Sequence, residues 1–183
     1  IGTTEIDNVS YIKKYIVNII NNKIRLYYTN IKSTSSEVKP IATLCLVHGF
    51  GHHSGEFLEF MTVMARNGVQ CHSIDLRGHG FSGGARFDWT VEEFHTDIIT
   101  LIKTSESDES LPIFVMGHSM GGGLISSLFI KNQYLQVNGI ILSAPLLGSP
   151  LTVEKNEFKN FILGKIGNDI RVNFNCLVLF ITF

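Results

Sequence analysis

The feature that most constrains the fold is a serine at the junction of two apolar runs, in the stretch PIFVMGHSMGGGLISSLFIK. Residues 112–117 are typical of a buried strand and residues 119–131 of a helix, so Ser119 falls at a very short turn. Gly117 and Gly121 flank it, as expected where a Cβ would clash with neighbouring backbone. A helix that starts here directs its N-terminal N–H groups toward the hydroxyl. The pattern predicts a reactive serine at the edge of a sheet.

The rest of the chain repeats this alternation of strand and helix. Strands are expected at residues 23–31, 41–49, 69–76, 112–117 and 137–145, and helices at 54–68, 90–104 and 119–131. The helix at 90–104 starts with a capping box of Thr90 and Glu93, and Val91, Phe94, Ile98 and Ile102 form its apolar stripe. Alternation of this kind predicts an α/β fold, with an open, mostly parallel sheet and helices on both faces.

Composition limits the classes of partner. The chain has 183 residues, 44% of them hydrophobic, which is enough for one domain with a sizeable core. Charged residues make up 17% and the net charge is -1, so no nucleic acid partner is expected. The chain contains no run of 18 apolar residues, so no transmembrane helix is expected. Lys13, Lys14 and several asparagines argue against a signal peptide at the start. Cys45 and Cys71 are expected as reduced core residues, which favours a cytoplasmic location.

Three loops are expected at the carboxyl ends of the strands, where active sites of parallel sheets lie: HGFGHHSG at 48–55, RGHGFSGG at 77–84 and GHSMGG at 117–122. The first is predicted to turn the N–H of Phe50 toward Ser119, where it would form an oxyanion hole with the N–H of Met120. Taken alone, each loop could equally be an ordinary glycine turn. The residues expected to support the loop and the serine turn are His48, Gly49, Gly117, His118, Gly121 and Gly122.

Two other kinds of site have partial support in the sequence. GHGFSG at 78–83 matches the pattern of a dinucleotide-binding loop, with Asp97 at a suitable distance, but ARFDW separates it from the next helix. His48, His52 and His53 suggest a metal, but the glycines between them prevent a helix that would align them, and no downstream carboxylate completes a set. We therefore expect neither a metal nor an organic cofactor.

The other histidines have structural interpretations. His95 falls on the apolar stripe of its helix and is expected to be a hydrogen-bonded core residue. His118 is expected to point away from the site, as a neighbour of a serine at such a turn. His52 and His53 are expected near the site as polar loop residues.

The segments LVHGFGHHSGEF, SIDLRGHGFSGG and FVMGHSMGGGL, in this order and spacing, resemble the α/β-hydrolase fold. Within it they are most similar to the monoacylglycerol lipase and lysophospholipase group, which has a serine aminopeptidase-like domain. The resemblance covers about residues 40–155, including ILSAPLLGSP. It implies Ser119 as nucleophile, Phe50 and Met120 as oxyanion donors, and cleavage of a lipid monoester through an acyl-enzyme. It also implies an apolar lid after Pro150, which would offer a contact with a membrane surface.

The triad partners of Ser119 are not identified. In this fold the order is serine, acid, histidine, but all seven histidines lie at or before position 118. The later acids, Glu154, Glu157 and Asp169, do not follow a predicted strand. The sequence is thus interpreted as a single, C-terminally incomplete domain over 1–183, with a core at about 23–149, the start of a lid at 150–169 and an apolar tail at 170–183. Alone, it is expected to be inactive.

Two alternatives to an esterase remain open from the sequence. One is an inactive hydrolase-like binding module, for which the missing histidine is the evidence. The other is a peptidase on the same scaffold, which would differ in the lid and the leaving-group pocket. The sequence does not fix the oligomeric state.

Overall fold

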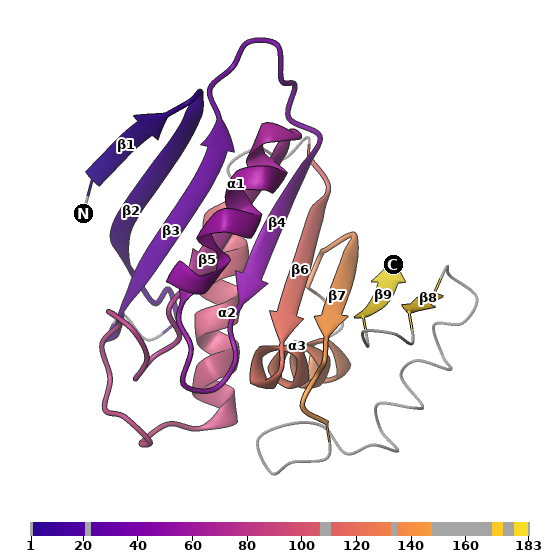
Figure 1. The fold of residues 1–183 in the computed structure, drawn as a ribbon. Coiled ribbons are helices and arrows are strands. Elements are labelled where there is room, and N and C mark those ends of the chain that lie inside the picture. The colour runs from indigo at the N-terminus through magenta and orange to yellow at the C-terminus, as the bar shows by residue number, and fades with distance from the viewer. Residues whose placement is uncertain are drawn as a thin grey trace.

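Four parallel strands form the centre of a mixed sheet (Figure 1). The computed structural model describes residues 2–20, 23–106, 111–132, 135–147, 170–173 and 178–182. The central strands are β5 (Val69–Ile74), β4 (Ala42–Val47), β6 (Ile113–His118) and β7 (Gly139–Ser143), in this spatial order. They confirm the predicted parallel α/β arrangement between residues 41 and 145.

Helices cover both faces of this sheet, as predicted (Figure 1). On one face lie the short 3-10 helix η1 (Ser54–Phe57) and α1 (Leu58–Arg66), and on the other lie α2 (Val91–Ser105) and α3 (Met120–Lys131). The single helix expected at 54–68 is therefore two segments. Gly68 follows the end of α1 and has φ +84°, the left-handed conformation that commonly terminates a helix.

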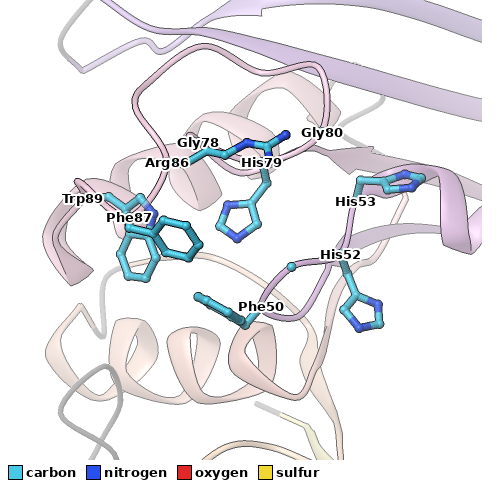
Figure 2. A pocket seen from close by; sticks show the side chains of 10 residues that line it. Phe50, His52, His53, Gly78, His79, Gly80, Arg86, Phe87 and Trp89 are labelled. Atoms are coloured by element: carbon cyan, nitrogen blue, oxygen red, sulfur yellow. The ribbon is translucent and has the colours of Figure 1, made fainter.

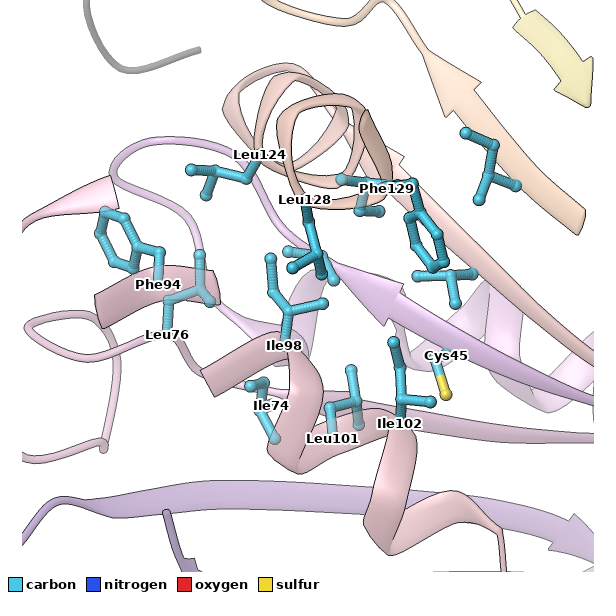
Figure 3. Close-up of a cluster of buried hydrophobic side chains, with 14 of the residues drawn as sticks. Cys45, Ile74, Leu76, Phe94, Ile98, Leu101, Ile102, Leu124, Leu128 and Phe129 are labelled. Carbon is cyan, nitrogen blue, oxygen red and sulfur yellow. The ribbon is translucent and has the colours of Figure 1, made fainter. Parts of the chain in front are cut away.

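Each face has its own hydrophobic core. Met61 and Ala65 of α1 pack with Leu44, Leu46 and Cys71 of the central strands. The larger core, on the other face, holds the predicted stripe of α2, in which Phe94, Ile98 and Ile102 are buried against α3 and the sheet (Figure 3). Burying a side chain of this size contributes about 1.5–3 kcal/mol, so these two layers hold the strand ends in place.

The N-terminal part of the sheet is antiparallel. β1 (Gly2–Ile6), β2 (Val9–Val17) and β3 (Arg25–Ser33) form a meander, and β3 pairs with β5. The expected strand at 23–31 corresponds to β3, whereas β1 and β2 were not predicted. Asp7 and Asn8 both have positive φ, at 50° and 60°, as a two-residue hairpin turn requires.

Two short strands complete the sheet beyond β7. β9 (Val178–Thr182) pairs with β7 and β8 (Ile170–Asn173) pairs with β9, both antiparallel. The predicted apolar tail, 170–183, thus contributes both of these strands to the sheet. The lid start expected at 150–169 lies outside the described residues.

The capping box at the start of α2 is confirmed and gives a first prediction. The Thr90 hydroxyl accepts the N–H of Glu93 at 3.2 Å, and the Glu93 carboxylate accepts the N–H of Thr90 at 2.8 Å. Thr90→Ala should lower the free energy of unfolding by about 1 kcal/mol, because it leaves the N–H of Glu93 without its side-chain acceptor. Urea denaturation would measure this. Thr104→Ala is the control, since the Thr104 hydroxyl donates only to a carbonyl of its own helix.

Candidate active site

Ser119 lies at the turn between β6 and α3, as predicted, and its backbone is strained. It is the N-cap of α3, with φ 52° and ψ −117°, a conformation that residues other than glycine rarely adopt. Its N–H donates to the Ser143 carbonyl at 3.0 Å, and its carbonyl accepts the N–H of Leu146 at 2.8 Å. Strain of this kind persists only where surrounding contacts fix it, and it is typical of active sites.

The glycines around Ser119 are required by close backbone contacts. A Cβ on Gly117 would lie 2.5 Å from the carbonyl oxygen of Gly121. A Cβ on Gly121 would lie 2.6 Å from the carbonyl oxygen of His48, in the first loop. The turn therefore packs directly against the end of β4, which explains the glycine pattern in the sequence.

The loop after β4 reaches the serine. A Cβ on Gly49 would lie 3.2 Å from the Cβ of Ser119 and 3.7 Å from its Oγ. The next residues form a turn, in which the N–H of His52 donates to the Gly49 carbonyl at 3.2 Å. Among the described residues, no acceptor takes the N–H of Phe50 or of Met120, the first residue of α3. The loop after β4 thus packs against the turn that holds Ser119.

His48 connects this loop to the loop after β5 through hydrogen bonds to backbone groups. It is buried, its Nε2 accepts the N–H of Leu76 at 2.9 Å, and its Nδ1 bonds to the Gly49 carbonyl at 2.8 Å. Burial lowers its pKa to about 4, so the ring is neutral at pH 7 and Nδ1 carries the proton. With both ring nitrogens bonded to backbone groups, His48 has none left to bind a metal.

A buried carboxylate that the sequence interpretation missed joins the first two loops. One oxygen of Asp75 accepts the N–H of Ser54 at 2.7 Å, and the other accepts the N–H of Phe81 at 2.8 Å. A Cβ on Gly80 would overlap this carboxylate. The signal in the sequence was an aspartate directly after a buried strand and before a glycine-rich loop.

Arg77 and Asp97 form a second buried network behind the site. The Arg77 guanidinium donates to Asp97 at 2.8 and 2.9 Å and to Glu93 at 2.6 Å. Burial alone would lower the pKa of Arg77, but the hydrogen bonds and charge of Asp97 and Glu93 raise it above its ordinary value. Because the carboxylate of Asp97 is paired with Arg77, Asp97 is not available as the acidic residue of a dinucleotide site.

This network gives a second prediction. Asp97→Ala should lower the free energy of unfolding by about 3–5 kcal/mol, because it leaves the buried Arg77 without its main partner. Glu92→Ala is the matched control on the same helix, since Glu92 pairs with Lys131 at 3.5 Å on an exposed surface. A similar loss of free energy of unfolding in both variants, measured by urea denaturation, would show that the buried pair stabilises the fold no more than the exposed pair does.

The remaining histidines near the site have defined partners. His95 is buried and its Nε2 bonds to the Ser127 hydroxyl at 2.7 Å, which confirms it as a core residue. His118 bonds through Nδ1 to the Ser143 hydroxyl at 3.2 Å, and its ring lies 6.4 Å from that of His52. His52 is half exposed and bonds through Nδ1 to the carboxylate of Glu56.

The His53 side chain caps η1 by accepting the N–H of Gly55 at 3.1 Å. Within the part of the chain that the structure describes, no three His, Cys, Asp or Glu side chains gather as metal ligands. None of the described helices is long and apolar enough to span a bilayer.

Comparison with known proteins agrees with this geometry. The family model described as serine aminopeptidase, S33, matches residues 38–178. A monoacylglycerol lipase of Mycolicibacterium smegmatis is 30% identical over 143 residues, which is 74% of this chain and 49% of the relative. A monoglyceride lipase of Rattus norvegicus is 32% identical over 137 residues, 69% of this chain and 44% of the relative. The chain thus spans less than half the length of these relatives.

Solved structures share the fold. A soluble variant of the monoglyceride lipase of Saccharomyces cerevisiae, in complex with a substrate analog, has a TM-score of 0.62 at 23% identity, covering 72% of this chain and 44% of that chain. A thermostable carboxyl esterase from Bacillus coagulans has the same TM-score at 24% identity, covering 72% of this chain and 43% of that chain. By its sequence and its fold, the chain belongs to the serine aminopeptidase S33 family of α/β-hydrolases.

Proposed function

We propose that this protein is a carboxylic ester hydrolase of the monoacylglycerol lipase type, with Ser119 as its nucleophile. The observation that carries the proposal is the strained turn at Ser119, with the loop of Gly49 packed against its side chain. A backbone held in this conformation presents the hydroxyl outside the sheet, at the N-terminus of a helix, where negative charge is favoured.

The proposed reaction has two steps. Ser119 Oγ attacks the ester carbonyl carbon as a base takes its proton, and the carbonyl oxygen becomes an oxyanion. The N–H groups of Phe50 and Met120 donate to that oxyanion, an interaction worth about 3–4 kcal/mol per donor. The carbon–oxygen bond to the alcohol then breaks, the alcohol takes the proton, and an acyl-enzyme remains. Water attacks the acyl-enzyme in the same way and releases the carboxylic acid.

Residues 1–183 do not supply the base of this reaction at its usual position in the sequence, after the serine and the acid. The triad of this fold follows the order serine, acid, histidine, and residues 119–183 contain no histidine. We therefore propose that the 183-residue chain by itself lacks the activating base. An inactive, hydrolase-like binding role is the alternative that this absence favours.

Apolar side chains beside the serine favour a lipid ester. Phe50 and Leu146 are 49% and 40% exposed, and the N–H of Leu146 donates to the carbonyl of Ser119. An acyl chain in this place would cover side chains that otherwise face water. The names of the relatives from Mycolicibacterium smegmatis and Rattus norvegicus support a monoacylglycerol, and the name of the family model keeps a peptide substrate as the rival.

The proposed location is cytoplasmic or peripheral to a membrane. Cys45 and Cys71 are buried free thiols, which supports a reducing compartment. Contact with a membrane through a lid at 150–169 stays a proposal, because those residues lie outside the described part of the chain.

The test uses residues 1–147 joined to the C-terminal part of a family member, which supplies the triad acid and histidine. This chimera should hydrolyse monoacylglycerol, Ser119→Ala should abolish the activity, and Ser126→Ala should retain it. Ser126 is the control because it lies in the same helix and its hydroxyl donates only to the Gly122 carbonyl. Cleavage of aminoacyl p-nitroanilides in place of esters would favour the peptidase. A folded chimera that turns over neither would favour the binding module.

A further inference from the structure

A cavity of about 240 Å³ lies between the loop after β4 and the loop after β5 (Figure 2). The side chains that define its chemistry are Phe50, His53, His79, Arg86, Phe87 and Trp89. Ser119 does not line the cavity, but Phe50, whose N–H is a proposed oxyanion donor, does, so the cavity adjoins the proposed catalytic site. The volume corresponds to roughly eight water molecules at about 30 Å³ each, enough for a small head group and a short hydrocarbon.

One wall of the cavity is aromatic. The ring of Phe50 lies 5.9 Å from that of Phe87 and 6.3 Å from that of Trp89, and Trp89 packs on Phe94 at 4.5 Å. Phe87 has φ +63° and is 78% exposed, so a strained backbone holds a large apolar ring against water. Strain and exposure of this kind are both costly without a ligand, and both are typical of binding sites.

The ionisable side chains that line the cavity are all of basic types. They are His52, His53, His79 and Arg86, and no aspartate or glutamate lines it. Figure 2 shows the imidazole of His79 directed into the space between Phe50 and Phe87. Arg86 forms no ion pair with the described residues, so its charge is free to pair with a ligand.

Two carboxylates of these loops are already engaged, and Asp88, between Phe87 and Trp89, is exposed and does not line the cavity. Both oxygens of Asp75 accept backbone N–H groups, and Glu56 bonds to His52. A ligand with acceptor oxygens and negative charge complements this surface.

We propose that this cavity binds an amphiphilic anion, with a carboxylate or phosphate head group on a hydrocarbon chain. Arg86 pairs with the head group, and the rings of Phe50, Phe87 and Trp89 cover the first carbons of the chain. The proposal does not rest on esterase activity, since binding is measured without turnover.

Trp89 makes the cavity directly observable. It is the only tryptophan of the chain, so its fluorescence reports on this wall. Titration of the 183-residue chain with sodium octanoate should change the emission saturably. Octanol, which lacks the charge, and acetate, which lacks the chain, should each bind at least about tenfold more weakly. Octyl phosphate is the second arm, and the tighter of the two octyl anions identifies the head group.

Two variants assign the contacts. Arg86→Gln should weaken octanoate binding about tenfold, because it removes a charged hydrogen bond. Arg66→Gln should leave it unchanged, since Arg66 pairs with Asp7 at 3.6 Å away from the cavity. Phe87→Ala should also weaken binding about tenfold, through loss of apolar contact. Circular dichroism checks that each variant is folded.

Three results would overturn the proposal. Equal binding of octanol and octanoate would reduce the cavity to an apolar cleft. Equal binding of acetate or inorganic phosphate would make it a simple anion site. Equal loss in Arg86→Gln and Arg66→Gln would show that net charge alone matters. The comparison of octanoate with octanol uses the unmodified chain, so it tests the proposal even if a variant fails to fold.

Discussion

Ester hydrolysis by the 183-residue chain alone is expected at close to background, about a million-fold below the chimera that carries the triad acid and histidine. A serine hydroxyl is a weak nucleophile until a base removes its proton, and loss of that base in a comparable enzyme costs about 8 kcal/mol of transition-state stabilisation. Of the proposed catalytic groups, the 183-residue chain has Ser119 and the N–H groups of Phe50 and Met120 but no base. Turnover of p-nitrophenyl esters by both proteins, at equal concentration, measures the difference.

One histidine could overturn this expectation. His52 bonds through Nδ1 to Glu56, as a triad histidine bonds to its acid, and it lies in the loop that reaches Ser119. If the 183-residue chain matched the chimera, His52→Ala would show whether His52 is the base. His95→Gln is the control, because His95 is buried against Ser127 in the core. Rates at background in the 183-residue chain exclude this role.

The free energy of unfolding is expected to fall strongly between pH 7 and pH 5. His48, His72 and His95 are buried, and burial lowers the pKa of each to about 4. In the unfolded chain these side chains titrate near 6.5, so protons bind the unfolded state first as the pH falls. The stability is therefore fully present above about pH 6.5 and is lost progressively down to about pH 4. At pH 5 the expected loss is about 2 kcal/mol for each histidine.

Urea denaturation at pH 7 and pH 5 measures this loss. His95→Gln should remove about a third of the pH dependence, since it removes one of three buried groups that resist protonation. A free energy of unfolding that is equal at the two pH values would contradict the buried, neutral state of all three rings.

The parts of the fold that sequence patterns predicted are those determined by local chemistry. The strand–turn–helix at Ser119, the capping box at Thr90 and the stop at Gly68 each depend on residues within a few positions of one another. The parallel sheet could be predicted from the alternation of strands and helices, because a strand followed by a helix and a second strand can adopt few topologies.

The features that were missed depend on residues far apart in the chain. The pairing of Arg77 with Asp97 and the loop contacts of Asp75 arise only when β5, α2 and the loop after β4 come together. The hairpin of β1 and β2 lacked a recognised turn, although Asp7 and Asn8 are residues that tolerate its conformation. The aromatic cavity joins two loops that were predicted at this edge of the sheet, but no spacing in the sequence indicates that the rings of Phe50, Phe87 and Trp89 come together.

The most direct test of the account is the site of a covalent adduct. The chimera would be treated with a fluorophosphonate, digested and analysed by tandem mass spectrometry, beside its Ser119→Ala and Ser126→Ala variants. The account predicts one adduct, on the peptide that contains Ser119, present in Ser126→Ala and absent in Ser119→Ala. An adduct on another serine, or undiminished labelling of Ser119→Ala, would contradict it.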